Sequence, residues 1–74
     1  SVEVIRRSAL SLLQLINDLP EGYRMVFNLY AIEGFSHREI SEVLKIEEST
    51  SRSQLVKARK VLQEKVIGQQ KTIL

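Results

Sequence analysis

The sequence predicts a small all-α domain of four helices. Apolar residues recur at steps of three and four along most of the chain, as they do on the buried face of a helix. No stretch alternates between apolar and polar residues in the way that a half-buried strand does. The chain has only three glycines and one proline; Pro20 and Gly34 fall where one predicted helix gives way to the next, and Gly68 falls at the end of the last one.

Composition limits the classes of protein to which the chain can belong. Its 74 residues suffice for one small domain. The absence of cysteine excludes disulfides and thiolate metal sites, and it fits a cytoplasmic setting. We find neither a signal peptide nor an apolar run long enough to span a bilayer, so no membrane partner is expected. The chain opens on Ser1 rather than Met, and we expect it to be a piece of a longer or processed protein.

The first helix is predicted over residues 2–18. Its apolar stripe is interpreted mainly as part of the domain's own core. The stripe comprises Ile5, Ala9, Leu12, Leu13 and Ile16, and it is widened by Leu10 and Leu15. Leu19 stands before a proline, which disfavours the α conformation, and the helix is therefore expected to end there.

Two shorter helices follow. Pro20 suits the first position of a second helix, which runs to about Glu33 and stops at Gly34. Ser36 and Glu39 have the spacing of a capping box, which predicts the start of a third helix that ends near Lys45.

The fourth helix is predicted to begin with Glu47 and Glu48, whose charges suit the positive end of a helix dipole, and to continue to about Ile67. Gly68 is interpreted as its stop, and residues 69–74 as a frayed tail. The predicted domain thus covers residues 1–68. A short helix, a tight turn and a longer basic helix make residues 36–67 a helix-turn-helix.

Charge is distributed unevenly and favours a nucleic-acid partner. The formal charge is −1 over residues 1–34 and +3 over residues 35–74. Helical geometry divides the fourth helix into two faces. One face is predicted to be core and holds Ser51, Leu55, Ala58 and Leu62. The other holds Ser49, Arg52, Ser53, Val56, Lys57 and Lys60.

The second of these faces has the residue types that a helix in the major groove of DNA needs. Arg52 can donate two parallel hydrogen bonds to guanine, and Ser49 and Ser53 are short enough to allow close approach. Val56 can contact a thymine methyl group. The cations further along suit phosphate contacts, which fix position and make affinity depend on salt. They are Lys57, Arg59 and Lys60.

The segment LPEGYRMVFNLYAIEGFSHREISEVLKIEESTSRSQLVKARKVL, residues 19–62, resembles the C-terminal DNA-binding domain (region 4) of bacterial sigma factors, most of all the extracytoplasmic-function group. The resemblance implies binding of the promoter minus-35 element and docking on the β-subunit flap of RNA polymerase. An anti-sigma factor is a further candidate partner. It adds Glu48 to the residues expected to read bases. It also implies that Arg38 reaches an adjacent phosphate.

The chain departs from the family pattern near the predicted turn. Ser41 stands where Ala is usual, and Lys45 stands where Gly is common, which implies either strain at a positive φ or a different turn. Glu47 replaces a Ser or Thr cap. Ser51 replaces an apolar residue, so we expect a lost core contact.

Two other classes of protein remain open. One is the effector domain of a response regulator, which enters its third helix through a similar segment, although the Leu19-Pro20 opening favours the sigma factor. The other is an interaction module that docks on polymerase or an anti-sigma factor. An enzyme is not expected, because the sequence offers no metal-ligand spacing, phosphate loop or catalytic pair, and no cofactor is predicted. His37, the one histidine, is expected to be an exposed or phosphate-facing residue.

Overall fold

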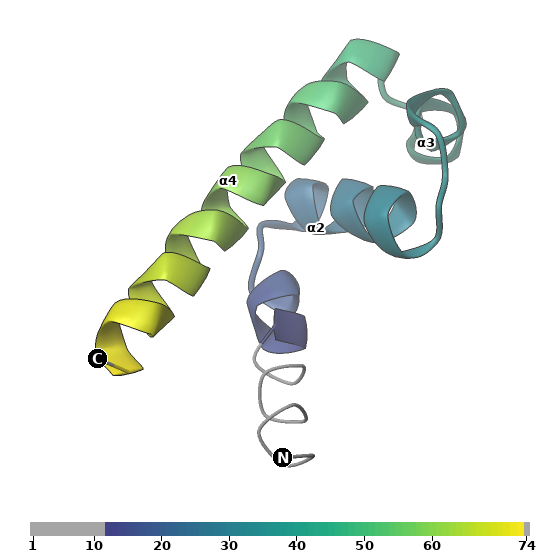
Figure 1. Ribbon diagram of the computed structural model, residues 1–74. Coiled ribbons are helices and arrows are strands. Elements are labelled where there is room, and N and C mark those ends of the chain that lie inside the picture. The colour runs from purple at the N-terminus through teal and green to yellow at the C-terminus, as the bar shows by residue number, and fades with distance from the viewer. Residues whose placement is uncertain (1–11, 74) are drawn as a thin grey trace.

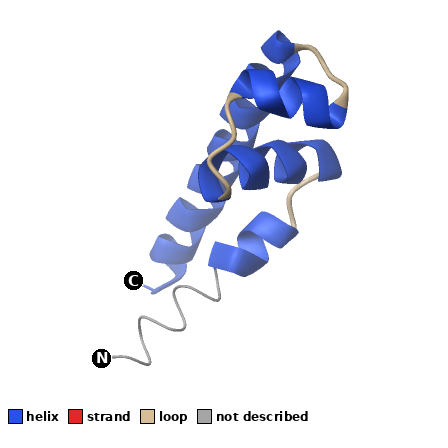
Figure 2. Ribbon diagram, turned by 90° about the vertical axis from the view of Figure 1, so that its right-hand side faces the viewer, coloured by secondary structure: helices blue, strands red, loops and turns tan. Residues whose placement is uncertain are grey.

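The computed structural model describes residues 12–73 of the chain. Residues 12–17 are helical and are followed by α2, a π-helical segment η1, α3 and α4 (Figure 1). The bounds of these elements are Glu21–Phe27 for α2, Asn28–Ile32 for η1, His37–Leu44 for α3 and Glu48–Ile73 for α4. The all-α fold and its four helices are as predicted, and the segments between helices are short (Figure 2).

The first helix ends where the sequence predicts. Its last helical residue is Asn17, and the Leu19 N–H donates to the carbonyl oxygen of Ile16 at 3.1 Å. Of the predicted apolar stripe, Ile16 is buried, whereas Leu12 and Leu13 are about half exposed. The predicted positions Ile5, Ala9 and Leu10 lie outside the described residues.

The second predicted helix is formed by α2 and η1 together. Pro20 is the N-cap of α2 and not its first helical residue, and its carbonyl oxygen accepts the first helical hydrogen bond from the Arg24 N–H. The π-helical turn is not predicted by the spacing of apolar residues; in it, the Glu33 N–H donates to the Asn28 carbonyl, five residues back. Gly34, at φ 78°, ends the element as predicted, because glycine adopts positive φ without steric cost.

The fourth helix is longer than predicted. It continues through Gly68 to Ile73, so the stop predicted at Gly68 is wrong. A glycine inside a helix costs about 1 kcal/mol relative to alanine, which weakens a helix without ending it. Within residues 12–73, no helix combines the length and the apolar character that crossing a membrane requires.

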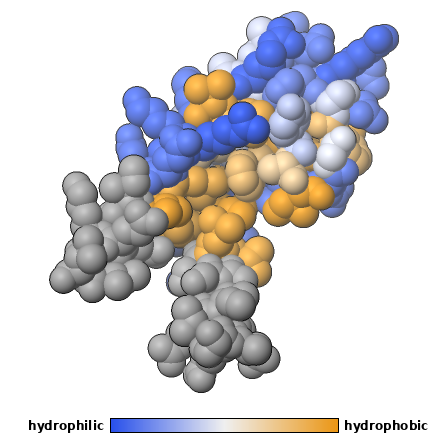
Figure 3. Space-filling model, viewed as in Figure 1, coloured by the Kyte–Doolittle hydropathy of each residue, from blue (hydrophilic) through white to orange (hydrophobic). Residues whose placement is uncertain are grey.

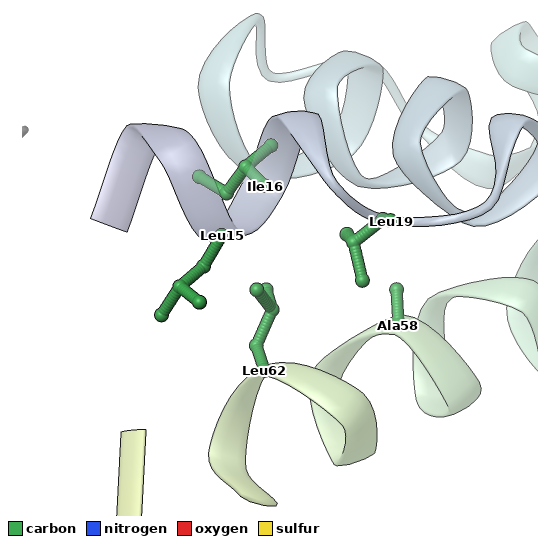
Figure 4. Close-up of a cluster of buried hydrophobic side chains, with 5 residues drawn as sticks. All are labelled: Leu15, Ile16, Leu19, Ala58 and Leu62. Atoms are coloured by element: carbon green, nitrogen blue, oxygen red, sulfur yellow. The ribbon is translucent and has the colours of Figure 1, made fainter. Parts of the chain in front are cut away.

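Two hydrophobic clusters hold the helices on α4. The first joins the end of the first helix to the middle of α4 (Figure 4) and consists of Leu15, Ile16, Leu19, Ala58 and Leu62. The second joins α2 and α3 to the start of α4 through Val26, Ile40 and Leu55. Phe27 packs against both. Figure 3 shows the apolar residues gathered where the helices meet and hydrophilic residues over the upper part of α4 and α3. The start of α4 is thus fixed to α3 and α2 from one side.

Candidate nucleic-acid interface

The start of α3 is fixed by the predicted capping box. The Ser36 hydroxyl accepts a hydrogen bond from the Glu39 N–H at 3.1 Å, and the Glu39 carboxylate accepts one from the Ser36 N–H at 2.9 Å. Hydrogen bonds from the backbone and then from the side chain of Ser36 hold the pKa of Glu39 below its ordinary value of 4.5. The capping box therefore satisfies two of the backbone N–H groups that have no partner within the helix at this end.

A single left-handed residue turns the chain from α3 into α4. Lys45 has φ 56° and ψ 48°, as expected of the position where the resembled family has glycine. The Lys45 N–H donates to the Ser41 carbonyl oxygen, as in the αL cap of a helix, and the Ile46 N–H donates to the same oxygen at 3.1 Å. This turn leaves only residues 45–47 between α3 and α4.

The two faces predicted for α4 are confirmed. The core face is buried along its length and comprises Ser51, Leu55, Ala58 and Leu62. The residues predicted to face DNA are all exposed, namely Ser49, Arg52, Ser53, Val56, Lys57 and Lys60. The same element therefore packs the domain through one side and presents small and basic side chains on the other.

At the leading end of α4, the five residues predicted to read bases lie within three turns. Glu48 Oε1 is 3.7 Å from Arg52 Nη1, and both side chains are about half exposed. The Ser53 hydroxyl donates its hydrogen to the Thr50 carbonyl oxygen at 3.0 Å. Toward a ligand, this hydroxyl can therefore act only as a hydrogen-bond acceptor. Val56 is 64% exposed, which leaves an apolar contact available.

The residues predicted to contact phosphates differ in their surroundings. Lys57 and Lys60 are exposed on α4. The guanidinium carbon of Arg59 lies 5.8 Å from the centre of the Tyr30 ring, within the range of a cation–π contact. Arg38, on α3, is 3.9 Å from the carboxylate of Glu42. All four are exposed, and their contact with phosphate stays a prediction.

His37 is not the exposed residue that the sequence suggested. It is half-buried, its ring stacks on Tyr30 with centroids 4.5 Å apart, and its Nδ1 lies 2.9 Å from the Ser51 hydroxyl oxygen. Ser51, which stands where the family has an apolar residue, is buried, and its hydroxyl has His37 as a hydrogen-bond partner. Reasoning from sequence missed this link because it depends on two residues fourteen positions apart.

An apolar cleft lies beside α4, and none of the residues predicted to face DNA lines it. Its volume is about 180 Å³, and its lining comes from α2, the turn and the start of α4. The lining residues are Gly22, Met25, Val26, Leu44, Ile46, Thr50 and Gln54. The Gln54 side-chain oxygen is buried there without a hydrogen-bond partner.

A capped short helix, a left-handed turn and a second helix with one buried and one exposed basic face define a helix-turn-helix DNA-binding domain. A family model described as sigma-70, region 4 matches residues 9–62, which is most of the chain. The chain belongs to this family. Neither the curated proteins nor the solved structures gave a match. In sigma factors generally, this region binds the promoter minus-35 element and RNA polymerase during transcription initiation.

Proposed function

We propose that this chain binds the minus-35 element of promoters as part of a sigma factor of the extracytoplasmic-function group, and that it has no catalytic role. The observation that carries the proposal is the exposed face of α4, on which short polar residues precede the cations. The family match supports the general role, and the segment quoted from residues 19–62 supports the narrower group. Both DNA and polymerase would place the protein in the cytoplasm.

The proposed roles follow the order of residues along α4. Glu48, Ser49, Arg52, Ser53 and Val56 would reach base edges, because the leading end of a recognition helix lies deepest in the major groove. Lys57, Arg59 and Lys60 would face phosphates, and Arg38 would reach a neighbouring phosphate from α3. Short side chains near the groove floor and long cations near its rim suit the shape of the groove.

The β-subunit flap of RNA polymerase is the protein partner that we propose. The apolar cleft supports this, because none of its lining residues is among those proposed to contact DNA, and the partly exposed Met25 is part of its lining. DNA and the flap could then bind together. An anti-sigma factor would compete for one of these two surfaces.

The test of the proposal is binding of the 74-residue chain to duplex DNA, followed by anisotropy of a labelled duplex. A library of randomised duplexes selected at low salt should yield one preferred sequence. Affinity should be weak, with a dissociation constant of about 1 μM or above near physiological salt, because other contacts of a full sigma factor and polymerase are missing. Selection of no sequence, or nanomolar binding by this chain alone, contradicts the proposal.

Polymerase docking has a separate test. Met25→Asp places a charge at the edge of the apolar cleft and should weaken capture of polymerase core by the chain. Its binding to duplex DNA should not change, since Met25 lies outside the basic face. Loss of DNA binding with intact polymerase capture would contradict this assignment of the two surfaces.

A further inference from the structure

The most informative contact in the interface is the ion pair between Glu48 and Arg52. The two side chains stand one helical turn apart at the leading end of α4, with 3.7 Å between Oε1 and Nη1. The helix dipole accounts for an acid in the first turn of α4, but a carboxylate that approaches DNA is also repelled by the phosphates. A carboxylate here must either leave the interface or find a donor within it.

We infer that Glu48 and Arg52 read one G·C base pair as a unit, an inference that rests on the proposed function. In the major groove, a G·C pair presents the N7 and O6 acceptors of guanine and then the N4 amino donor of cytosine, in that order. The guanidinium of Arg52 supplies the two donors, and the carboxylate of Glu48 supplies the acceptor. Their pairing places donors and acceptor side by side, which matches the order along this base pair.

The pair rejects the other base pairs as well as accepting this one. An A·T pair offers an amino donor beside the N7 acceptor, so one Arg52 donor faces a donor. In a C·G pair the order is reversed, and Glu48 then faces guanine acceptors. Leaving such polar groups unmatched in a desolvated groove is costly, which is how a site discriminates against the wrong partner.

Glu48 also reduces binding of Arg52 to DNA in general. An arginine alone on an exposed face attracts phosphates of any sequence, whereas a neighbouring carboxylate offsets that attraction. Ser49 and Ser53 stand beside the pair and are short, so they do not hold it away from the groove. Glu48 is therefore a specificity-determining residue of the interface.

The alternative is that the pair belongs to an ordinary solvated helix surface, where such pairs contribute little. The chain contains a matched example on α3. Arg38 and Glu42 have the same spacing, lie 3.9 Å apart and are more exposed, with 83% and 70% of their side-chain areas accessible. Glu42→Ala therefore removes the acid of an equivalent pair that is not proposed to read a base.

The experiment selects bound sequences from randomised duplexes at low salt with the 74-residue chain, its variants Glu48→Ala, Arg52→Ala and the double variant, and Glu42→Ala as control. The unchanged chain should select G·C at one position. Each single variant should lose about tenfold or more of the preference for G·C over A·T at that same position. The double variant should lose no more than either single variant, because the two residues act together.

Two further readouts separate this role from a general effect on folding or charge. Arg52→Lys keeps the charge but lacks the paired donors, and it should lose the G·C preference while retaining the salt dependence. Glu48→Ala should bind unrelated duplexes more tightly than the unchanged chain does. Preference lost at different base pairs in the two single variants, or lost equally in Glu42→Ala, overturns the inference. If the unchanged chain selects no sequence, the proposed function fails, and this inference fails with it.

Discussion

His37 Nδ1 and the Ser51 hydroxyl oxygen lie 2.9 Å apart, and this hydrogen bond joins the first residue of α3 to the buried face of α4. Ser51 is fully buried, so its hydroxyl has no access to water. The other side of the contact is held by the stack of the His37 ring on Tyr30. The two helices of the helix-turn-helix are thus joined at both ends of α3, by the turn at Lys45 and by this polar contact.

Removal of His37 should cost more stability than removal of the Ser51 hydroxyl. His37→Ala leaves a buried hydroxyl without a partner, at about 1–3 kcal/mol, and it also removes the stack on Tyr30. Ser51→Ala removes the hydroxyl itself and leaves a half-buried ring nitrogen that water can reach, at about 0.5–1.5 kcal/mol. Unfolding by urea, followed by circular dichroism, measures both.

The double variant supplies the control. In the His37→Ala background, Ser51→Ala removes the unsatisfied group, so the two changes together should cost less than the sum of the two alone. A strictly additive pair, or a larger loss from Ser51→Ala than from His37→Ala, would show that the hydrogen bond does not link the helices.

Lys45→Gly should stabilise the domain. A non-glycine residue in the left-handed region costs about 1–2 kcal/mol, and part of this gain is offset by the greater freedom of glycine in the unfolded chain. The expected net gain is on the order of 0.5 kcal/mol, measured as a shift in the urea midpoint at an unchanged slope. Lys60→Gly is the matched control: in the middle of α4 the same change should destabilise by about 1 kcal/mol. If both variants are destabilised alike, Lys45 does not have the left-handed conformation.

The features that the sequence predicts correctly depend on neighbouring residues. The capping box of Ser36 and Glu39 is set by a spacing of three, and the faces of α4 are set by the helical repeat. Each follows from a rule about residues that are close in the sequence, so the sequence alone was sufficient to predict it.

The features that the sequence does not predict depend on tertiary contacts or on small energy differences. His37 is drawn into the fold by Tyr30 and Ser51, which come from two other elements. The spacing of the apolar residues did not distinguish the π-helical turn from an α-helical one. Gly68 was predicted to end α4, but a single glycine only weakens a helix, and α4 continues through it to Ile73. The ion pair of Glu48 with Arg52 was not predicted either, although a spacing of four residues between acid and base could have indicated it.

The capping box should make the stability of the domain depend on pH in the acidic range. The pKa of Glu39 is lower in the folded state than its ordinary value of 4.5. Its carboxylate therefore stabilises the fold above that value, and this contribution is lost as the pH falls through the lower, folded-state pKa. Glu39→Gln should lower the melting temperature at pH 7 and have a smaller effect at acidic pH, once the carboxylate is protonated in the folded state as well.

Ser36→Ala separates the cap from the charge. It removes the hydroxyl that accepts from the Glu39 N–H, and it should cost about 1 kcal/mol, or about 4–8 °C in melting temperature for a domain of this size. Unlike Glu39→Gln, it should lower the melting temperature at acidic pH too, because the hydroxyl acts as an acceptor at any pH. If the effect of Glu39→Gln is the same at both pH values, the carboxylate does not act through the capping box.

Lys57→Ala should weaken binding to all duplexes by the same factor and reduce its dependence on salt. A lysine that neutralises one phosphate releases about 0.9 counterion, so the slope of log affinity against log salt should become shallower by about that amount. The preferred sequence should not change, since phosphates carry no sequence information. Lys65→Ala is the control, because Lys65 is an exposed cation of α4 outside the proposed interface, and its loss should leave the slope nearly unchanged. An unchanged slope for Lys57→Ala, or an equal change for Lys65→Ala, would show that the cations act only through the overall charge of the domain.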